Sequence, residues 1–148
     1  MTEEEGPFRF EHRVPVRFSD IDAGGHAHHS QVLVYMEEAR TRYWEEVAGR
    51  RGVEEIDFIL AEARVRYRSR VLYPDLLRVL VRVGSIGRRH FEMLYEVWSD
   101  RGEILAEGAT TMVMFDYARE RSTEVSDELR GRIEAFEGHA LPRRRPRS

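Results

Sequence analysis

The sequence predicts an α+β fold in which an antiparallel five-stranded sheet wraps around one long central helix. The first observation behind this prediction is that apolar residues recur at helical spacing between positions 32 and 47. The second is that the segments before and after this helix alternate between apolar and polar residues, which is typical of strands with one buried face. A long helix inserted after the first strand favours a layered architecture with the helix on one face of the sheet.

The first strand is expected between Phe8 and Phe18, where the even positions are mostly apolar and the odd positions mostly polar. Pro15 has no backbone N–H to donate to a neighbouring strand, so this strand should lie at an edge of the sheet or be bulged there. The helix follows this strand, and Gly49 and Gly52 mark its end.

Four more strands are expected after the helix, at residues 61–71, 77–83, 91–97 and 104–115. Residues 84–90 and 100–102 are expected to be turns. The last strand is apolar or small on both faces, which favours a central position in the sheet, covered by the helix. Ser126 is a typical residue to begin a second, shorter helix, and Gly138 is a typical residue to end it.

Length and composition restrict the class of protein. A chain of 148 residues with 41% hydrophobic content is large enough for one globular domain and too short for two ordinary ones. We expect this domain to span residues 1–138 and the Arg-rich tail, residues 139–148, to be disordered. The chain contains no Cys, which excludes disulfides, thiolate metal sites and Cys nucleophiles.

Hydropathy and charge exclude further classes. No apolar run approaches the ~18 residues that a membrane span needs, and the acidic start, MTEEEGP, does not resemble a signal peptide. A cytoplasmic protein without a membrane span is therefore expected. The formal net charge of -3 includes four Arg in the last seven residues, so the rest of the chain is more acidic still. This argues against a nucleic-acid surface as the main function.

The segment RFSDIDAGGHAHHSQVLVYMEEAR, residues 17–40, concentrates the residues that suit chemistry. The pair Gly24-Gly25 allows the backbone to adopt positive φ and to approach a ligand closely. The first N–H groups of the helix that follows have no intrahelical partners, and the helix N-terminus favours an oxyanion. A carboxylate just upstream, such as Asp22, can act on a carbonyl held there, as nucleophile or as base for a water. This arrangement suits acyl transfer.

Other interpretations apply to several of these residues. Asp22 could simply cap the loop, and Asp20, at the end of the strand, suits a structural hydrogen bond. His26, His28 and His29 could join the two aspartates in a metal site, but their loop spacing is weak evidence for one. We therefore expect no metal.

The same segment resembles the signature of the hotdog-fold acyl-CoA thioesterases of the 4-hydroxybenzoyl-CoA thioesterase type, which carry an aromatic residue, Asp-x-Asp, Gly and a helix with Glu-x-Ala-Arg or similar. The match is dense over residues 17–40. The order of elements, a strand, a long helix and four strands, also resembles the family from Phe8 to Thr123.

The resemblance implies roles for individual residues. Asp22 takes the catalytic carboxylate position, Gly25 that of the turn glycine, and His29 that of the residue whose backbone N–H polarises the thioester carbonyl. Arg88 and Arg89, in a turn before Phe91, fall where family members often hold the phosphates of coenzyme A. The implied substrate is an acyl-CoA, without a further cofactor. A second branch of hotdog thioesterases draws its carboxylate from the helix, which makes Glu38 the reserve candidate.

Three functional classes remain open on the sequence. The leading one is hydrolysis of an acyl-CoA to free acid and coenzyme A. The second is a hotdog dehydratase or acyl-carrier-protein enzyme, for which a His from a partner chain would face Asp22. The third is a non-catalytic acyl-CoA binding protein. In each case a second copy of the chain can complete the assembly through an edge strand or a sheet face, so a homodimer or homotetramer is expected.

Overall fold

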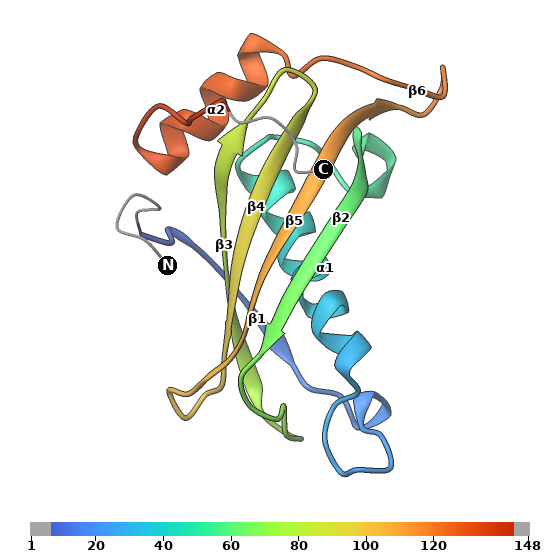
Figure 1. Cartoon of the computed structure of the whole chain (residues 1–148), viewed down its shortest axis with the longest axis vertical. Coiled ribbons are helices and arrows are strands. Elements are labelled where there is room, and N and C mark those ends of the chain that lie inside the picture. The colour runs from blue at the N-terminus through green and yellow to red at the C-terminus, as the bar shows by residue number, and fades with distance from the viewer. Residues whose placement is uncertain (1–6, 144–148) are drawn as a thin grey trace.

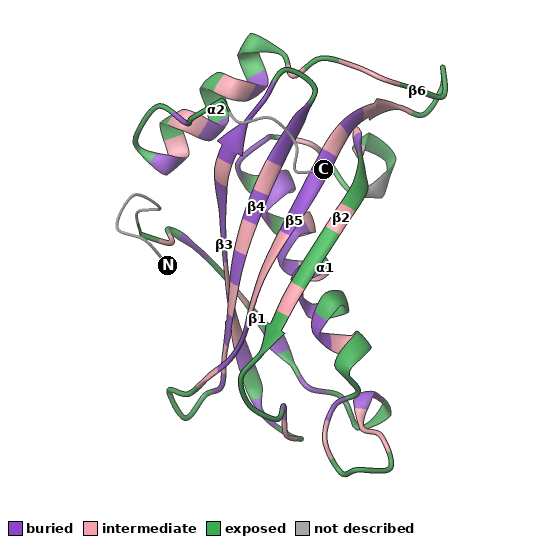
Figure 2. Ribbon diagram, viewed as in Figure 1, coloured by how far each residue is buried: buried purple, intermediate pink, exposed green. Residues whose placement is uncertain are grey.

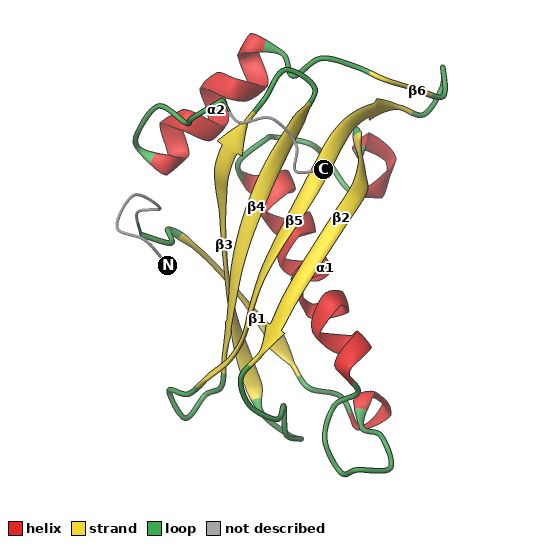
Figure 3. Ribbon diagram, in the orientation of Figure 1, coloured by secondary structure: helices red, strands yellow, loops and turns green. Residues whose placement is uncertain are grey.

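A computed structural model describes residues 7–143 of the chain, without the side chain of Val53. One twisted antiparallel sheet forms one layer, and a long helix, α1 (His29–Glu46), lies along one face of it (Figures 1 and 3). A second helix, α2 (Asp127–Glu137), lies at the end of the sheet where β3 turns into β4. The predicted α+β class, the long helix and the second helix from Ser126 to Gly138 are confirmed.

Within residues 7–143 the sheet contains six strands, one more than the five predicted. The strands are β1 (Phe10–Pro15), β2 (Phe58–Tyr67), β3 (Leu76–Ile86), β4 (His90–Trp98), β5 (Ile104–Asp116) and the two-residue β6 (Arg121–Ser122). Their order is β1-β3-β4-β5-β2, with β6 paired to the end of β5. β5 is therefore an inner strand, as predicted, and β1, which contains Pro15, is an edge strand, as predicted.

The bounds of three strands differ from the predicted ones. β1 ends at Pro15 and not at Phe18, which begins a short 3-10 helix, Phe18–Asp20. The other two strands, β2 and β3, contain bulges. β2 covers residues 58–67 rather than 61–71, with a register shift between Leu60 and Glu62. β3 continues to Ile86, through residues predicted to be a turn, because a register shift between Val83 and Ser85 absorbs Gly84. A bulge adds one residue to a strand without ending its pairing, so the two-residue period is interrupted while the strand continues.

The core lies between α1 and the sheet, where α1 packs against β1 and β3. Trp44 of α1 stacks on Phe91 of β4, with ring centroids 4.9 Å apart, and meets Phe58 of β2 edge-on at 5.0 Å. All three are buried. Aromatic pairs in these geometries contribute about 0.5–1.5 kcal/mol each beyond the area they bury, so this cluster fixes α1 against the sheet.

The C-terminal residues also contact the sheet. Leu141 is buried, and the carbonyl of Pro142 accepts a hydrogen bond from the backbone N–H of Ile86. These residues belong to the segment 139–143 of the predicted tail. Residues 144–148 of that tail lie outside the described residues, as do residues 1–6. In the described part of the chain, no helix is both long and apolar enough to span a membrane.

The outer strand β2 is exposed along most of its length, in contrast to β3 and β4 (Figure 2). Ile59 and Leu60 on this strand are exposed, and so are Leu33 and Val34 on α1. A long edge strand with apolar side chains leaves backbone hydrogen-bonding groups free for another strand.

Candidate active site

The loop between β1 and α1 contains Asp22 and is closed at its base. Ile21 and Ala27 form an isolated antiparallel bridge, and the backbone N–H of Gly25 donates to the carbonyl of Asp22 at 3.0 Å. Gly25 has φ of +82°, a left-handed conformation that glycine adopts without strain. The glycine predicted for this turn therefore has the backbone conformation that favours glycine.

Asp20 holds the start of this loop against α1. Its carboxylate accepts hydrogen bonds from the Tyr35 hydroxyl at 2.7 Å and from the Arg17 backbone N–H at 3.0 Å, and its carbonyl accepts one from the His28 N–H. Burial is the main cause that raises the pKa of the Tyr35 phenol, and the hydrogen bond to Asp20 raises it further. Asp20 is itself buried, so its contacts are structural, as the sequence suggested.

Asp22 is only partly buried. One of its carboxylate oxygens accepts a hydrogen bond from the Gly24 N–H at 2.8 Å. The other carboxylate oxygen has no hydrogen-bond partner among the described residues. Asp22 therefore combines the capping contact expected of a loop aspartate with an oxygen available for chemistry.

The N-terminus of α1 leaves one backbone donor available beside Asp22. His28 is the N-cap residue, and its imidazole Nδ1 accepts from the Ser30 N–H at 3.2 Å. The N–H groups of Ala27, His28 and Gln31 donate to backbone carbonyls. Within residues 7–143, no hydrogen bond uses the N–H of His29. This is the group predicted to polarise a carbonyl, and it stands in the positive end of an 18-residue helix.

A cavity of about 330 Å³ adjoins these groups. Asp22, His26, Ala27, His29 and Val32 line it from the loop and α1, and residues 67–71 line it from the end of β2 and the loop that follows. The backbone N–H of Ala27 donates to the carbonyl of Val71 at 2.8 Å and joins the two walls. The volume is at the lower end of the ~300–1,000 Å³ range of small-molecule pockets.

Tyr67, the last residue of β2, connects the sheet to the first turn of α1. Its hydroxyl donates to the backbone carbonyl of His29 at 2.8 Å, and its ring meets the His29 ring edge-on, with centroids 6.4 Å apart. This contact fixes the residue that carries the available N–H. The strand pattern assigns Tyr67 only to the apolar face of a strand, because nothing in its spacing links it to a loop so far away in the sequence.

The other predicted residues lie elsewhere. Glu38 forms an ion pair with Arg17 at 3.1 Å and lines a separate groove of about 500 Å³ between α1, His12 of β1 and the segment after α1. Arg88 and Arg89 lie in the β3–β4 turn, at the opposite end of the sheet (Figure 1). Arg88 pairs with Glu124, and Arg89 donates to the carbonyl and the hydroxyl of Ser122. Within one chain the structure does not bring these arginines to Asp22.

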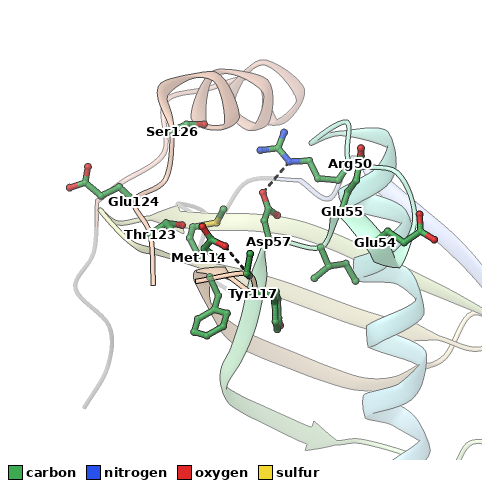
Figure 4. Close-up of a pocket in the computed structure, with 13 residues that line it drawn as sticks. Arg50, Glu54, Glu55, Asp57, Met114, Tyr117, Thr123, Glu124 and Ser126 are labelled. Atoms are coloured by element: carbon green, nitrogen blue, oxygen red, sulfur yellow. Dashed lines mark hydrogen bonds and ion pairs between the residues drawn. The ribbon is translucent and has the colours of Figure 1, made fainter. Parts of the chain in front are cut away.

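A larger pocket, about 480 Å³, lies at the N-terminal end of β2 (Figure 4). Its lining includes Asp57, Tyr117 and Glu124, and its cation, Arg50, is paired with Asp57 at 3.1 Å and with Glu128 at 3.3 Å. None of the residues predicted to be functional lines this pocket. In residues 7–143 no three His, Cys, Asp or Glu side chains are grouped so that they could hold a metal ion.

Comparisons with known proteins identify the family and the fold. The profile of the Thioesterase-like superfamily matches residues 16–133. A solved thioesterase from Thermus thermophilus, complexed with coenzyme A and Zn, is 34% identical, and the match covers 90% of this chain and 98% of that one with a TM-score of 0.83. The DHNA-CoA thioesterase of Staphylococcus aureus is 18% identical over 87% of this chain and 93% of that one, with a TM-score of 0.74, and so shares the fold.

A sequence relative is also known. The uncharacterized protein YsmA of Bacillus subtilis (strain 168) is 26% identical over 121 residues, which cover 82% of both chains. The profile match spans well over half of this chain, and it includes the Asp22 loop, α1 and every strand except β1. The chain therefore belongs to the thioesterase-like superfamily, has its hotdog fold, and is a thioester hydrolase.

Proposed function

We propose that this enzyme hydrolyses acyl-CoA thioesters in the cavity between the Asp22 loop and the start of α1. The observation that carries the proposal is that Asp22 and His29 line the same cavity of ligand size. The Asp22 carboxylate is partly exposed, and no described residue uses the helix N-terminal N–H of His29. The bound coenzyme A of the Thermus thermophilus thioesterase, at 34% identity, supports this choice of thioester.

The geometry supports a simple mechanism. The thioester oxygen accepts a hydrogen bond from the His29 N–H, and the helix N-terminus stabilises the negative charge that develops there. With Asp22 as base, its free oxygen takes a proton from water, the water oxygen bonds to the acyl carbon, and the C–S bond breaks. The thiolate leaves with little assistance because a thiol pKa is near ~8.5. The proton on Asp22 is then released to the thiolate or to solvent.

Asp22 as nucleophile would give the same products through an acyl-aspartate anhydride, which water then hydrolyses. A single turnover in ¹⁸O-labelled water separates the routes. Attack by water places ¹⁸O in the first molecule of product acid, whereas attack by Asp22 and hydrolysis at the aspartyl carbonyl places unlabelled carboxylate oxygen there.

The first test is Asp22→Asn, with Glu38→Gln as the matched control. Removal of a positioned base or nucleophile lowers kcat by ~10² or more, so Asp22→Asn should lose at least that factor while its thermal unfolding stays close to wild type. Glu38→Gln should keep kcat within about twofold, since Glu38 lines another groove. An inactive Glu38→Gln beside an active Asp22→Asn would assign catalysis to the helix carboxylate instead.

We further propose a homodimer that pairs the exposed β2 edges of two copies. Leu105 and Met114 lie near the two ends of β5, nine residues apart. At about 3.3 Å per residue, the two ends of the sheet are about 30 Å apart within one chain. An antiparallel pairing of β2 with its copy places the N-terminal end of one β2 beside the C-terminal end of the other. The Arg88–Arg89 turn of the partner would then lie about three strand spacings, roughly 14 Å, from the Asp22 cavity.

In this dimer, Arg88 and Arg89 of one copy would bind the phosphates of an acyl-CoA whose thioester lies at Asp22 of the other. Complementation between two variants tests whether the arginines and Asp22 of one site come from different chains. Asp22→Asn homodimers should be nearly inactive, and Arg88→Ala/Arg89→Ala homodimers should show a KM for acyl-CoA raised several-fold, the sign of lost binding. Mixed dimers contain one site with both functions intact, so mixing should restore activity with the wild-type KM. Mixtures that show only the high KM would place both functions on one chain.

A further inference from the structure

The cavity wall opposite α1 carries two polar groups that the proposed hydrolysis does not use. This wall consists of residues 67–71. Its first arginine, Arg68, is paired with Glu107 at 2.7 Å. Its second arginine, Arg70, makes no hydrogen bond or ion pair with any other described residue, and neither does the hydroxyl of Ser69. A guanidinium and a hydroxyl are thus free of described partners on the wall of the cavity that contains Asp22.

The size of the cavity limits what these groups can bind. A space of about 330 Å³ is roughly 9 Å across. In coenzyme A about twelve bonds of uncharged pantetheine separate the sulfur from the nearest phosphate, and twelve bonds of extended chain span about 14 Å. With the thioester at Asp22 and the His29 N–H, an extended pantetheine arm places the phosphates outside this cavity. In that arrangement, an anionic group bound inside the cavity belongs to the acyl part of the substrate.

The rest of the lining fits a short chain that ends in an anion. Ala27, Val32 and Val71 are buried apolar residues of this cavity and can cover methylene groups. On the same cavity, the planar guanidinium of Arg70 can donate two parallel hydrogen bonds to a carboxylate, and the Ser69 hydroxyl can donate a third.

We propose that Arg70, assisted by Ser69, is a specificity-determining residue that selects short acyl groups with a terminal carboxylate. This inference rests on the proposed function, because it takes Asp22 as the position of the thioester. The substrate class is dicarboxylic acyl-CoA thioesters with acyl groups of about five or six carbons. The apolar residues contact the methylenes, and Arg70 contacts the distal carboxylate.

Matched substrates test the proposal. Glutaryl-CoA and valeryl-CoA each have five acyl carbons, adipoyl-CoA and hexanoyl-CoA each have six, and within each pair the terminal carboxylate distinguishes the two. Hydrogen bonds to charged groups correspond to about a tenfold effect or more. Wild-type enzyme should therefore show a kcat/KM at least ~10-fold higher for one or both dicarboxylic substrates than for the matched neutral substrate. Arg70→Gln should remove this preference and leave the neutral substrates within about twofold of wild type.

Arg66→Gln is the matched control. Arg66 is an exposed arginine of β2 that forms no ion pair with another described residue, and it does not line the cavity. Strand alternation places it on the opposite face of the sheet from Tyr67. The control removes the same charge from almost the same place and should leave both substrate classes unchanged.

Three results would overturn the proposal. The first is a wild-type enzyme without preference for either dicarboxylic substrate. The second is an Arg70→Gln variant that loses equally on both substrate classes as coenzyme A thioesters but not as bare pantetheine thioesters, which would assign Arg70 to the phosphates. The third is an equal effect of Arg66→Gln. In each case Asp22-dependent hydrolysis of valeryl-CoA would show that the proposed function stands alone, whereas no hydrolysis of any acyl-CoA would refute both.

Discussion

The Tyr67→Phe variant would measure how much the position of the His29 peptide contributes to the proposed mechanism. Tyr67→Phe removes one hydrogen bond, 2.8 Å long, to the His29 carbonyl and keeps the ring that lines the cavity. A neutral hydrogen bond contributes about 0.5–1.5 kcal/mol, and about 1.36 kcal/mol of barrier is tenfold in rate. If the bond acts on the oxyanion donor, kcat should fall by about 2- to 10-fold.

The assay is the steady-state release of coenzyme A thiol, with KM measured alongside kcat. A donor that acts mainly on the transition state affects kcat and leaves KM within about twofold. Tyr73→Phe is the control, because Tyr73 is similarly exposed, 51% against 48%, and its hydroxyl makes no hydrogen bond with another described residue. Equal losses in the two variants, or a raised KM with unchanged kcat in Tyr67→Phe, would refute this account of Tyr67.

Two further predictions concern metal and stability. Dialysis against a strong chelator should leave kcat unchanged, because in the proposed mechanism the helix N-terminus polarises the thioester. Activity that is lost and then restored by one divalent ion would contradict this. The Tyr43 hydroxyl and the Val83 N–H donate hydrogen bonds to Glu137 at 2.5 and 3.1 Å. In Glu137→Ala both donors lose their acceptor in the core. The free energy of unfolding, measured in urea titrations, should therefore fall by about 2–6 kcal/mol. Burial raises the pKa of the Glu137 carboxyl above its unfolded value near 4.5. Protonation of Glu137 therefore contributes stability that is complete below this unfolded pKa and is lost as pH rises through the higher folded pKa. Glu137→Gln should remove that pH dependence and cost less than Glu137→Ala at neutral pH.

The sequence could predict that the Asp22 loop and the start of α1 lie together, because these residues are contiguous. Asp22, Gly25 and His29 lie close together in the chain, and a loop that enters a helix constrains where such groups can point. The two-residue period likewise predicted most of the sheet, since alternate burial is a local property of a strand.

The opposite half of the site could not be predicted. The alternation of Arg66, Arg68 and Arg70 continues past the true end of β2 at Tyr67, so the pattern places Arg70 on the outward face of a strand. In the structure it belongs to a loop that the hydrogen bond between Ala27 and Val71 holds against the Asp22 loop. That contact joins positions far apart in the sequence, and neither residue carries a local signal of it.

The contacts of Asp20 have a consequence for how the enzyme responds to temperature. Asp20 accepts hydrogen bonds from Arg17, which follows β1, and from His28, the residue before α1. It also accepts one from Tyr35, in the second turn of α1. These hydrogen bonds fix the two ends of the loop in the folded state, so that part of the entropy of ordering the loop is lost during folding and not during substrate binding. The candidate site at the Asp22 loop should therefore keep its geometry until the hydrogen bonds around Asp20 break together. Its activity should follow the Arrhenius law up to that point and then fall abruptly, at or below the temperature at which the sheet itself unfolds.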